Sequence, residues 1–409
     1  MTDRLYYTDP YLREFDATVQ RVETRGDRTL VTLDRTAFYP TSGGQPFDTG
    51  TLGPFRVVDV VDEDDGTIAH VVEPRTENAE PSTLNPEPNG VVHGVVDWRR
   101  RFDHMQQHTG QHVLSAAFER LFHVRTVSFH LGSDVSTIDL AREASPREIA
   151  EAEDEANRVV WEDRPVAIRF ASAEEAARLP LRKEPVRGGT LRLIDVEQFD
   201  LSACGGTHVA RTGGIGVIAV SRWERFKGGQ RLEFVCGGRA LRAYRLLRDA
   251  TASSIKLLSV LPAELPSAIE RLLVETKDQA RVRNALQQEL ARYRADDLAA
   301  TAELIGGAKV VLAIVDADAN GLKTIATAVA AKPGHVAVAV SGSAPAALVV
   351  VSRAADGVAL SAQQVIAALV ARFGGRGGGR PELAQAGGLN ASPDEIVAAA
   401  RTIVTSSVT

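Results

Sequence analysis

Cysteine is scarce in this chain, which has only Cys204 and Cys236 among its 409 residues. So few cysteines exclude a disulfide framework and fit a reducing compartment. The chain also has no run of eighteen apolar residues, and its first residues lack the apolar stretch of a signal peptide. These absences predict a soluble, cytoplasmic protein without a membrane partner, and the length allows roughly two to four domains.

Positive charge is not in excess either. The formal net charge is −6, and the acidic surplus lies in the first hundred residues. This balance excludes indiscriminate attraction to nucleic acid but not binding through a local basic patch. Residues 98–101, Trp-Arg-Arg-Arg, are such a patch, and the sequence leaves open whether they contact RNA or only begin a solvated helix.

Two short pairs of metal-type ligands stand out. The first pair is His108 and His112, and the second is Cys204 and His208. Residues four apart in a helix share a face, so the first pair can direct both imidazoles at one ion. Gly205 and Gly206 would place the second pair on a tight turn without Cβ atoms. One thiolate and three imidazoles suit Zn²⁺, so we expect a shared zinc site.

The first pair also excludes one class of enzyme. A zinc peptidase of the His-Glu-x-x-His type needs a glutamate directly after its first histidine, and Thr109 stands there. Hydrolysis at this site would therefore need another source of base catalysis.

Alternation of apolar and polar residues predicts short strands at 17–22, 29–33, 57–61, 67–72 and 91–98, typical of a small barrel. A helix is expected over 102–121, with Val113, Leu114, Ala117 and Leu121 on its buried side. Residues 126–240 predict an α+β unit. In this unit the Cys204–His208 pair is expected on a turn between strands at 191–196 and 216–223. Helices are expected to begin at Ser145 and near Ser172.

Residues 241–305 favour helices broken at Leu261-Pro262 and Leu265-Pro266, with a long exposed arm over 269–300. The last hundred residues alternate apolar strands (310–315, 336–340, 348–351) with helices (322–331, 362–373, 393–404), an α/β pattern. A glycine-rich loop at 373–380 carries Arg376 and Arg380. Such a loop can wrap a phosphate or RNA backbone, although a plain flexible loop is the alternative.

Three motifs in order resemble the editing domain of alanyl-tRNA synthetases and the AlaX-type trans-editing proteins. They occupy residues 33–50, 103–116 and 204–209, and the glycine-rich stretch resembles the DHHA1 module. The resemblance implies a β-barrel domain (1–98), a zinc-binding editing domain (99–240), a helical linker or arm (241–305) and a C-terminal DHHA1-like tRNA-binding domain (306–409). The expected fold is therefore α+β and multidomain. The editing-type β-structure begins almost at residue 1, so we expect no aminoacylation core.

The family likeness implies a trans-editing hydrolase that deacylates Ser-tRNA(Ala), and also Gly-tRNA(Ala), at a Zn²⁺ site. It assigns Thr36 to the serine hydroxyl, Gln45 to substrate binding or water orientation, and Arg376 and Arg380 to tRNA. The motif at residues 40–44, Pro-Thr-Ser-Gly-Gly, departs from the Pro-Glu-Gly-Gly-Gly pattern frequent in relatives. Mischarged tRNA(Ala) would be the partner, and residues 241–409 could form a homodimer.

Two alternatives belong to other classes. A zinc-stabilised RNA-binding protein without catalysis would use the four ligands only structurally. A zinc hydrolase of small acylated molecules would leave residues 306–409 without a role. The sequence does not decide whether three or four protein ligands hold the ion, nor whether the ion activates water or only positions the substrate.

Overall fold

The computed structural model describes all residues except 75–86, 183–188, 343–346, 357 and 409. Its contacts divide the chain into two compact units, Met1–Ser253 and Ser254–Thr409. The four-part division expected from the sequence stays a prediction. No described helix combines the length and apolarity that crossing a membrane requires.

The first unit begins with a closed barrel, as predicted. Its strand order is β2 (Glu14–Arg25), β3 (Arg28–Leu33), β7 (Ile68–Pro74), β6 (Phe55–Asp62), β5 (Gly50–Leu52) and β8 (Val91–Val96). Outside the barrel, β1 (Asp3–Arg4) pairs with β4 (Arg35–Thr36), and the 3-10 helix η1 (Leu5–Tyr7) lies between them in sequence. Inward-facing side chains such as Phe15, Val19 and Phe38 fill the barrel, as period-2 alternation requires.

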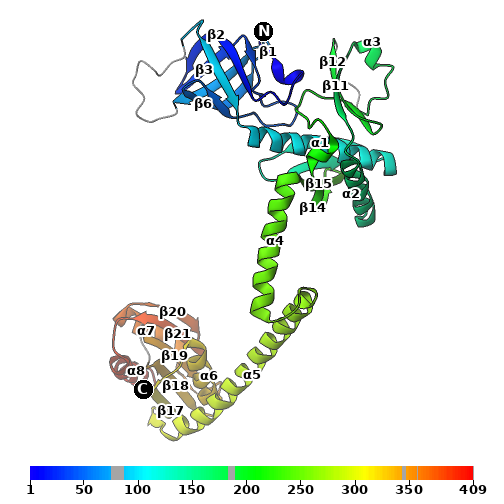
Figure 1. Cartoon of the computed structure of the whole chain (residues 1–409). Coiled ribbons are helices and arrows are strands. Elements are labelled where there is room, and N and C mark those ends of the chain that lie inside the picture. The colour runs from blue at the N-terminus through cyan, green and yellow to red at the C-terminus, as the bar shows by residue number, and fades with distance from the viewer. Residues whose placement is uncertain (75–86, 183–188, 343–346, 357, 409) are drawn as a thin grey trace. The chain divides into compact units, whose positions relative to one another are not determined.

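Helix α1 (Trp98–Phe122) connects the barrel to the rest of this unit (Figure 1). Asp97 caps its first turn by accepting a hydrogen bond from the Arg100 N–H. Residues 104–105 and 107–118 are all buried, so most of the helix is enclosed. Leu121 is 44% exposed, which corrects the expected buried face, because the last turn of α1 has left the core.

Two small antiparallel sheets complete the first unit. The first has the order β14 (Ile218–Phe226), β15 (Gly229–Cys236), β10 (Ser136–Leu140) and β9 (Thr126–Leu131), and the second β11 (Val166–Ala171), β12 (Leu191–Val196) and β13 (Asp200–Ala203). The helical elements here are α2 (Pro146–Trp161), α3 (Ala173–Ala176) and η3 (Thr212–Ile215). Ser145 closes a capping box with Glu148 at the start of α2, as its sequence predicts. The helix expected near Ser172 is only one turn long.

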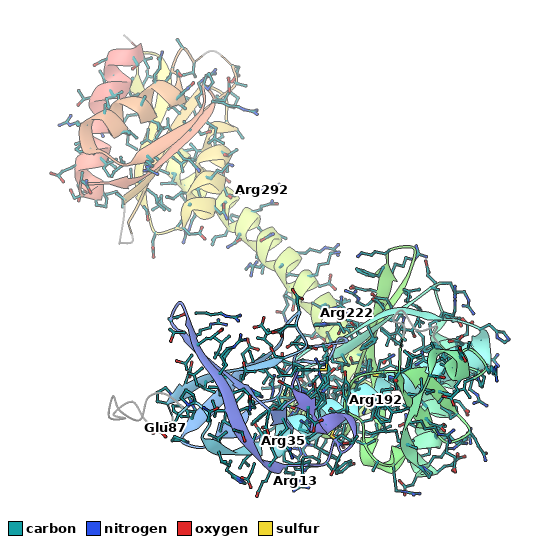
Figure 2. All side chains as sticks on the ribbon, turned by 90° about the horizontal axis from the view of Figure 1, so that it is seen from above. Arg13, Arg35, Glu87, Arg192, Arg222 and Arg292 are labelled. Carbon is teal, nitrogen blue, oxygen red and sulfur yellow. The ribbon has the colours of Figure 1, made fainter. Side chains whose placement is uncertain are left out.

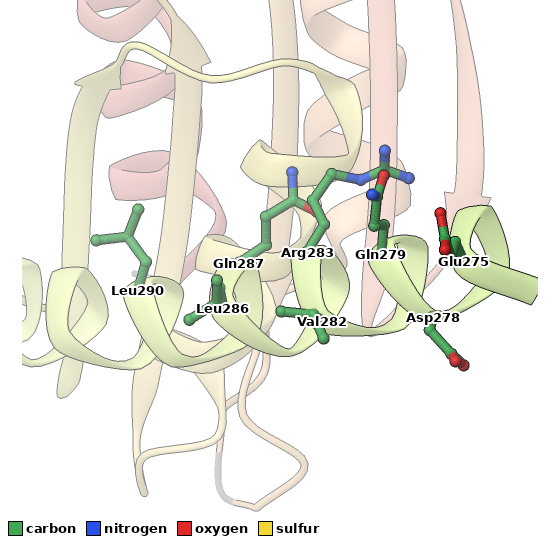
Figure 3. Close-up of a pocket in the computed structure, with 8 residues that line it drawn as sticks. All are labelled: Glu275, Asp278, Gln279, Val282, Arg283, Leu286, Gln287 and Leu290. Atoms are coloured by element: carbon green, nitrogen blue, oxygen red, sulfur yellow. The ribbon is translucent and has the colours of Figure 1, made fainter. Parts of the chain in front are cut away.

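Helix α4 (Gly237–Leu258) crosses the boundary between the units, and η4 (Pro262–Glu264) and α5 (Leu265–Ala300) follow. The break at Pro262 is real, but Pro266 lies in the first turn of α5, where proline is tolerated. Among the residues of α5 only Ala268, Ala291 and Ala295 are buried. Figure 3 shows Val282, Leu286 and Leu290 on this helix, each at least half exposed.

The second unit contains a six-stranded sheet of order β16 (Glu303–Ile305), β17 (Ala308–Val315), β18 (His335–Ser341), β19 (Ala347–Arg353), β21 (Leu383–Leu389) and β20 (Arg376–Arg380). Only β17 and β18 pair in parallel. One face packs on α6 (Ala319–Ala330) and the end of α5, and the other on α7 (Ala362–Phe373) and α8 (Pro393–Val408). The glycine-rich stretch is thus an edge strand rather than a loop, because residues 376–380 pair with β21.

A candidate metal centre and the cavity beside it

The structure brings the two predicted ligand pairs to one point. One ligand atom from each of His108, His112, Cys204 and His208 lies within 4.8 Å of all the others. The Cys204 Sγ is 3.3 Å from the His108 Nε2 and 3.4 Å from the His208 Nε2. The three imidazoles are buried, whereas Cys204 is partly exposed.

The two pairs are positioned by different kinds of backbone. His108 and His112 lie one turn apart on α1, and Cys204 directly follows β13. A Cβ at Gly206 would stand only 2.1 Å from the His108 Cε1, so the turn can approach the imidazole only because glycine occupies this position. Arg192, labelled in Figure 2, supports the turn by donating to the carbonyl oxygens of Cys204 and Gly206.

Each imidazole is oriented through its Nδ1 atom. His108 Nδ1 is 2.8 Å from the Gln45 Oε1, and His112 Nδ1 is 3.0 Å from the Asp200 Oδ2. His208 Nδ1 is 3.2 Å from the Thr109 Oγ1, a hydroxyl that also accepts from the Val209 N–H and donates to a backbone oxygen. Outer partners of this kind fix the tautomer of metal-binding histidines and leave Nε2 free to coordinate.

Electrostatics at the cluster favour a thiolate. Burial opposes the charged form of Cys204, but the imidazoles of His108 and His208 lower the pKa of its thiol well below the ordinary value. Burial also disfavours a charged His112, yet hydrogen bonds to Asp200 and Cys204 outweigh it and raise its pKa to about 9. Burial and the neighbouring His108 lower the pKa of His208 to about 3. A divalent cation here would replace a proton shared between thiolate and imidazole.

The distances from the Cys204 Sγ to His108 and His208 fit zinc. Bond lengths of about 2.3 Å to sulfur and 2.0–2.1 Å to nitrogen place tetrahedral ligand atoms roughly 3.3–3.6 Å apart. The two Sγ–Nε2 distances of 3.3 and 3.4 Å match this spacing. Three nitrogens and one sulfur are also a donor set that zinc prefers. That the site binds zinc stays a prediction, and these four side chains are the ligands it would use.

A cavity of about 200 Å³ lies against the cluster. Two of the candidate ligands, His112 and Cys204, form part of its wall. The other lining residues are Gly43, Gln111, Thr126, Val127, Ser128, Phe129, Arg182, Ser202, Ala203 and Gly205. The cavity is smaller than the roughly 300–1,000 Å³ of sites for drug-sized ligands, so it suits a small group next to the metal-type ligands.

Thr36 is the last residue of strand β4, and its side chain contacts His70 of the barrel strand β7. It is fully buried, and its Oγ1 is 2.8 Å from the His70 Nε2 and accepts from the Phe38 N–H. The His70 Nδ1 is 2.9 Å from the backbone oxygen of Val31, so Nδ1 donates there and Nε2 accepts the Thr36 proton. Among the described residues, no hydrogen bond joins Thr36 to the four ligands. Contact between Thr36 and a substrate stays a prediction.

Gln45 lies behind the cluster. Its Oε1 accepts from the Thr207 N–H as well as facing His108, and its Nε2 donates to the Thr207 Oγ1. The amide is fully buried and does not line the cavity. Its contacts therefore orient His108 and the 204–208 turn, and a direct contact with substrate stays a prediction.

The sequence left open whether residues 98–101 contact RNA or begin a solvated helix, and Arg101 does neither. Its side chain is fully buried, so it belongs neither to a solvated helix start nor to an exposed RNA-binding patch. It donates to the Asp48 carboxylate and to the backbone oxygens of Pro10 and Ala37. This contact fastens the barrel to the helix that carries His108 and His112.

Arg376 and Arg380 lie in the second unit, on strand β20, and both are exposed. Residues four apart in a strand share a face, at a spacing of about 13 Å. Gly378, between them on that face, has open space where a Cβ would stand. Arg376 also lines a cavity of about 340 Å³ together with Gly377 and Gly378.

Several supporting residues were not identified from the sequence. Asp200, Thr109 and Arg192 hold the ligands, and Gln111 and Arg182 line the cavity. Thr109 directly follows the candidate ligand His108, and this position in the sequence could have indicated its supporting role. The Asp200–His112 contact joins residues 88 apart in the chain, so no local sequence pattern predicts it.

Comparison with known proteins shows two matching family models. The threonyl and alanyl tRNA synthetase second additional domain matches residues 191–233, and the DHHA1 domain matches residues 307–406. A solved C-Ala domain of Aquifex aeolicus alanyl-tRNA synthetase is 22% identical and covers 26% of this chain and 98% of its own length. Its TM-score of 0.24 is too low to bear on the fold.

Two kinds of relative match nearly the whole of this chain. The alanine–tRNA ligases of Pyrococcus abyssi and Halobacterium salinarum are 35% and 38% identical over 94% and 95% of this chain, which spans only 42% of their length. The alanyl-tRNA editing protein AlaX-L of Pyrococcus horikoshii is 32% identical over 406 residues, covering 97% of this chain and 96% of that protein. With two family models matched and nearly the whole relative covered, the chain belongs to the alanyl-tRNA editing protein family that includes AlaX-L.

Proposed function

We propose that this protein is a trans-editing hydrolase that deacylates Ser-tRNA(Ala), and also Gly-tRNA(Ala), without aminoacylation activity. The observation that carries the proposal is the cluster of four metal-type ligands beside a small cavity, in a member of an alanyl-tRNA editing family. A zinc ion bound there would supply Lewis-acid chemistry at the ester that joins the amino acid to the terminal adenosine.

The residues of the chain position that chemistry. Gln45, Asp200 and Thr109 hold the three imidazoles so that each Nε2 points to the common point. Asp200 is itself held by Arg182, whose Nε lies 2.6 Å from Oδ1. The small cavity would receive the aminoacyl group and restrict which groups reach the ligands.

The test is direct incubation of the purified full-length protein with Ser-tRNA(Ala), Gly-tRNA(Ala) and Ala-tRNA(Ala). We expect release of serine and glycine and little release of alanine, with release abolished by a chelator and restored by Zn²⁺. A protein that binds tRNA but releases no amino acid would instead be the zinc-stabilised RNA-binding protein.

Contact with tRNA is proposed for Arg376 and Arg380. Both guanidinium groups lie on the exposed edge strand, and no described residue forms an ion pair with either. Two unpaired cations on one face suit an anionic backbone. The double Arg376→Ala/Arg380→Ala variant should reduce the salt dependence of tRNA binding by a slope of about 2, roughly one per phosphate contact. Arg372→Ala, in helix α7 of the same unit, is the matched control and should leave the slope nearly unchanged.

We also propose that residues 241–409 form a homodimer. Helix α5 exposes Val282, Leu286 and Leu290, spaced four apart along one face. Light scattering of the full-length protein should give the mass of two chains, and Leu286→Glu should give the mass of one. Asn284→Glu, on the opposite side of the helix, is the control that should stay dimeric. A monomeric mass for the unaltered protein refutes this part of the proposal.

A further inference from the structure

One buried acceptor beside the metal-type cluster has no partner in the part of the chain that the structure describes. Gln111 is 2% exposed, and its Oε1 makes no hydrogen bond to any described residue. Buried polar side-chain atoms are nearly always paired, and an unpaired one costs free energy unless a ligand or water completes it. Gln111 lines the same cavity as the candidate ligands His112 and Cys204.

The other end of the Gln111 amide is held in place. Its Nε2 donates to the Ser115 Oγ at 2.9 Å, and the Thr126 hydroxyl donates to the same oxygen at 2.7 Å. These two donors occupy both lone pairs of Ser115. These hydrogen bonds therefore hold the Gln111 amide nitrogen toward Ser115, and the amide oxygen remains as an acceptor without a donor.

We propose that Gln111 is a specificity-determining residue, whose Oε1 accepts a hydrogen bond from the side-chain hydroxyl of a seryl group bound in the cavity. The inference rests on the proposed function and names the residue that would recognise serine. A neutral amide oxygen suits a neutral hydroxyl donor, whereas the substrate's ammonium group would be better matched by a carboxylate. Alanine has no hydroxyl, so an alanyl group would leave this buried acceptor unpaired, and sites built in this way reject such analogues.

Thr36 is less suited to the same task. Its hydroxyl proton is directed to His70 of the barrel strand β7, and Thr36 is not among the residues that line the cavity. Gln111 combines burial, a free acceptor and a place on the cavity wall.

The test measures kcat/KM of the full-length protein on tRNA(Ala) charged with serine, glycine or alanine. Gln111→Met keeps the side-chain length but removes the acceptor. We expect its serine value to fall about tenfold, the size of one lost hydrogen bond in a shielded site. The glycine and alanine values should stay within about twofold, so the serine-to-alanine ratio also falls about tenfold. Gln111→Glu keeps an acceptor oxygen and should retain most of the ratio.

A neighbouring glutamine provides the matched control. The Gln107 amide is fully engaged, donating to the Cys236 backbone oxygen and accepting from the Cys236 N–H. Gln107→Met should lower thermal stability without changing the serine-to-alanine ratio. Zinc content and the thermal transition of each variant show that the site and fold persist.

Three outcomes overturn the inference. These are an equal fall on all three substrates in Gln111→Met, no fall on any of them, and a loss in Gln111→Glu as large as in Gln111→Met. The last would mean that the amide acts through its N–H group. Failure of the unaltered protein to hydrolyse any of the three substrates would be a different result, because it refutes the proposed function itself.

Discussion

Replacing Gly206 by alanine should weaken zinc binding, and the neighbouring Gly205 provides the matched control. A Cβ at Gly206 would lie 2.1 Å from the His108 Cε1 and 2.3 Å from its Nδ1. A Cβ at Gly205 would meet nothing nearer than the Tyr7 hydroxyl at 3.5 Å, which is ordinary contact. The two substitutions add the same methyl group to adjacent residues, so they differ only in what that group meets.

The backbone at Gly206 cannot easily retreat. Its carbonyl oxygen accepts from Arg192 at 2.8 Å, and its N–H donates to the Cys204 Sγ at 3.3 Å. The His108 imidazole must therefore move by roughly 1.3 Å to reach ordinary contact distance. Metal–ligand distances tolerate only about 0.2 Å, so such a shift takes the His108 Nε2 away from the common point.

The expected magnitude follows from the cost of overpacking, about 1–3 kcal/mol. If that strain falls on the metal-bound state, zinc affinity decreases by roughly 5- to 160-fold. Competition with a chromophoric chelator measures the affinity of Gly206→Ala, Gly205→Ala and the unaltered protein. Gly205→Ala should stay within about twofold of the unaltered protein. Equal affinities for the two variants would refute the reasoning that the turn approaches His108 because Gly206 lacks a Cβ.

Three further predictions concern the Arg101–Asp48 contact, the two thiols and the second unit. Arg101→Met strands the Asp48 carboxylate in the core and should lower the stability of this unit by about 3–5 kcal/mol in thermal or denaturant unfolding; adding Asp48→Leu should recover part of the loss. In zinc-free protein, iodoacetamide should label Cys204 at pH values below the ordinary thiol pKa of about 8.5, because its thiolate persists there. Cys236 should stay unlabelled, because burial raises the pKa of its thiol. Bound zinc should protect Cys204 from labelling, and equal labelling of both thiols by mass spectrometry would contradict the assignment. Removing all residues after Ser253, where the first unit ends, should raise KM for charged tRNA far more than it lowers kcat, as expected for lost uniform binding; unchanged KM would assign the second unit another role.

That truncation point is the end of the first unit, whereas the sequence predicts a domain boundary near residue 240. Arg239 is buried and bonds to the Asp103 carboxylate through both Nε and Nη2. A chain ending before Arg239 would lose this contact with helix α1, and the assay would then report damage to the fold as well as lost tRNA contact.

Much of this protein follows from local sequence. The spacing of His108 and His112 on a helix, the Ser145-Pro146 start of α2 and the alternation in the barrel strands are set by residues within a few positions of one another. Capping, helical periodicity and strand alternation act over that short range, which is why the sequence predicts these elements well.

Other features were decided only by the tertiary structure. The residues at 376–380 form an edge strand because β21 offers its backbone hydrogen bonds, although five residues with three glycines read locally as a loop. Arg101 is buried because Asp48, 53 residues earlier in the chain, supplies its counter-charge.

The same division holds at the site. The sequence identifies which residues can bind a metal, because ligand chemistry belongs to side chains and spacing. It does not show that Asp200 orients His112 or that the Gln111 oxygen is left unpaired, because both depend on which side chains meet across 88 residues of chain or around a cavity. Contacts between residues this far apart in the chain depend on how side chains pack in the folded protein.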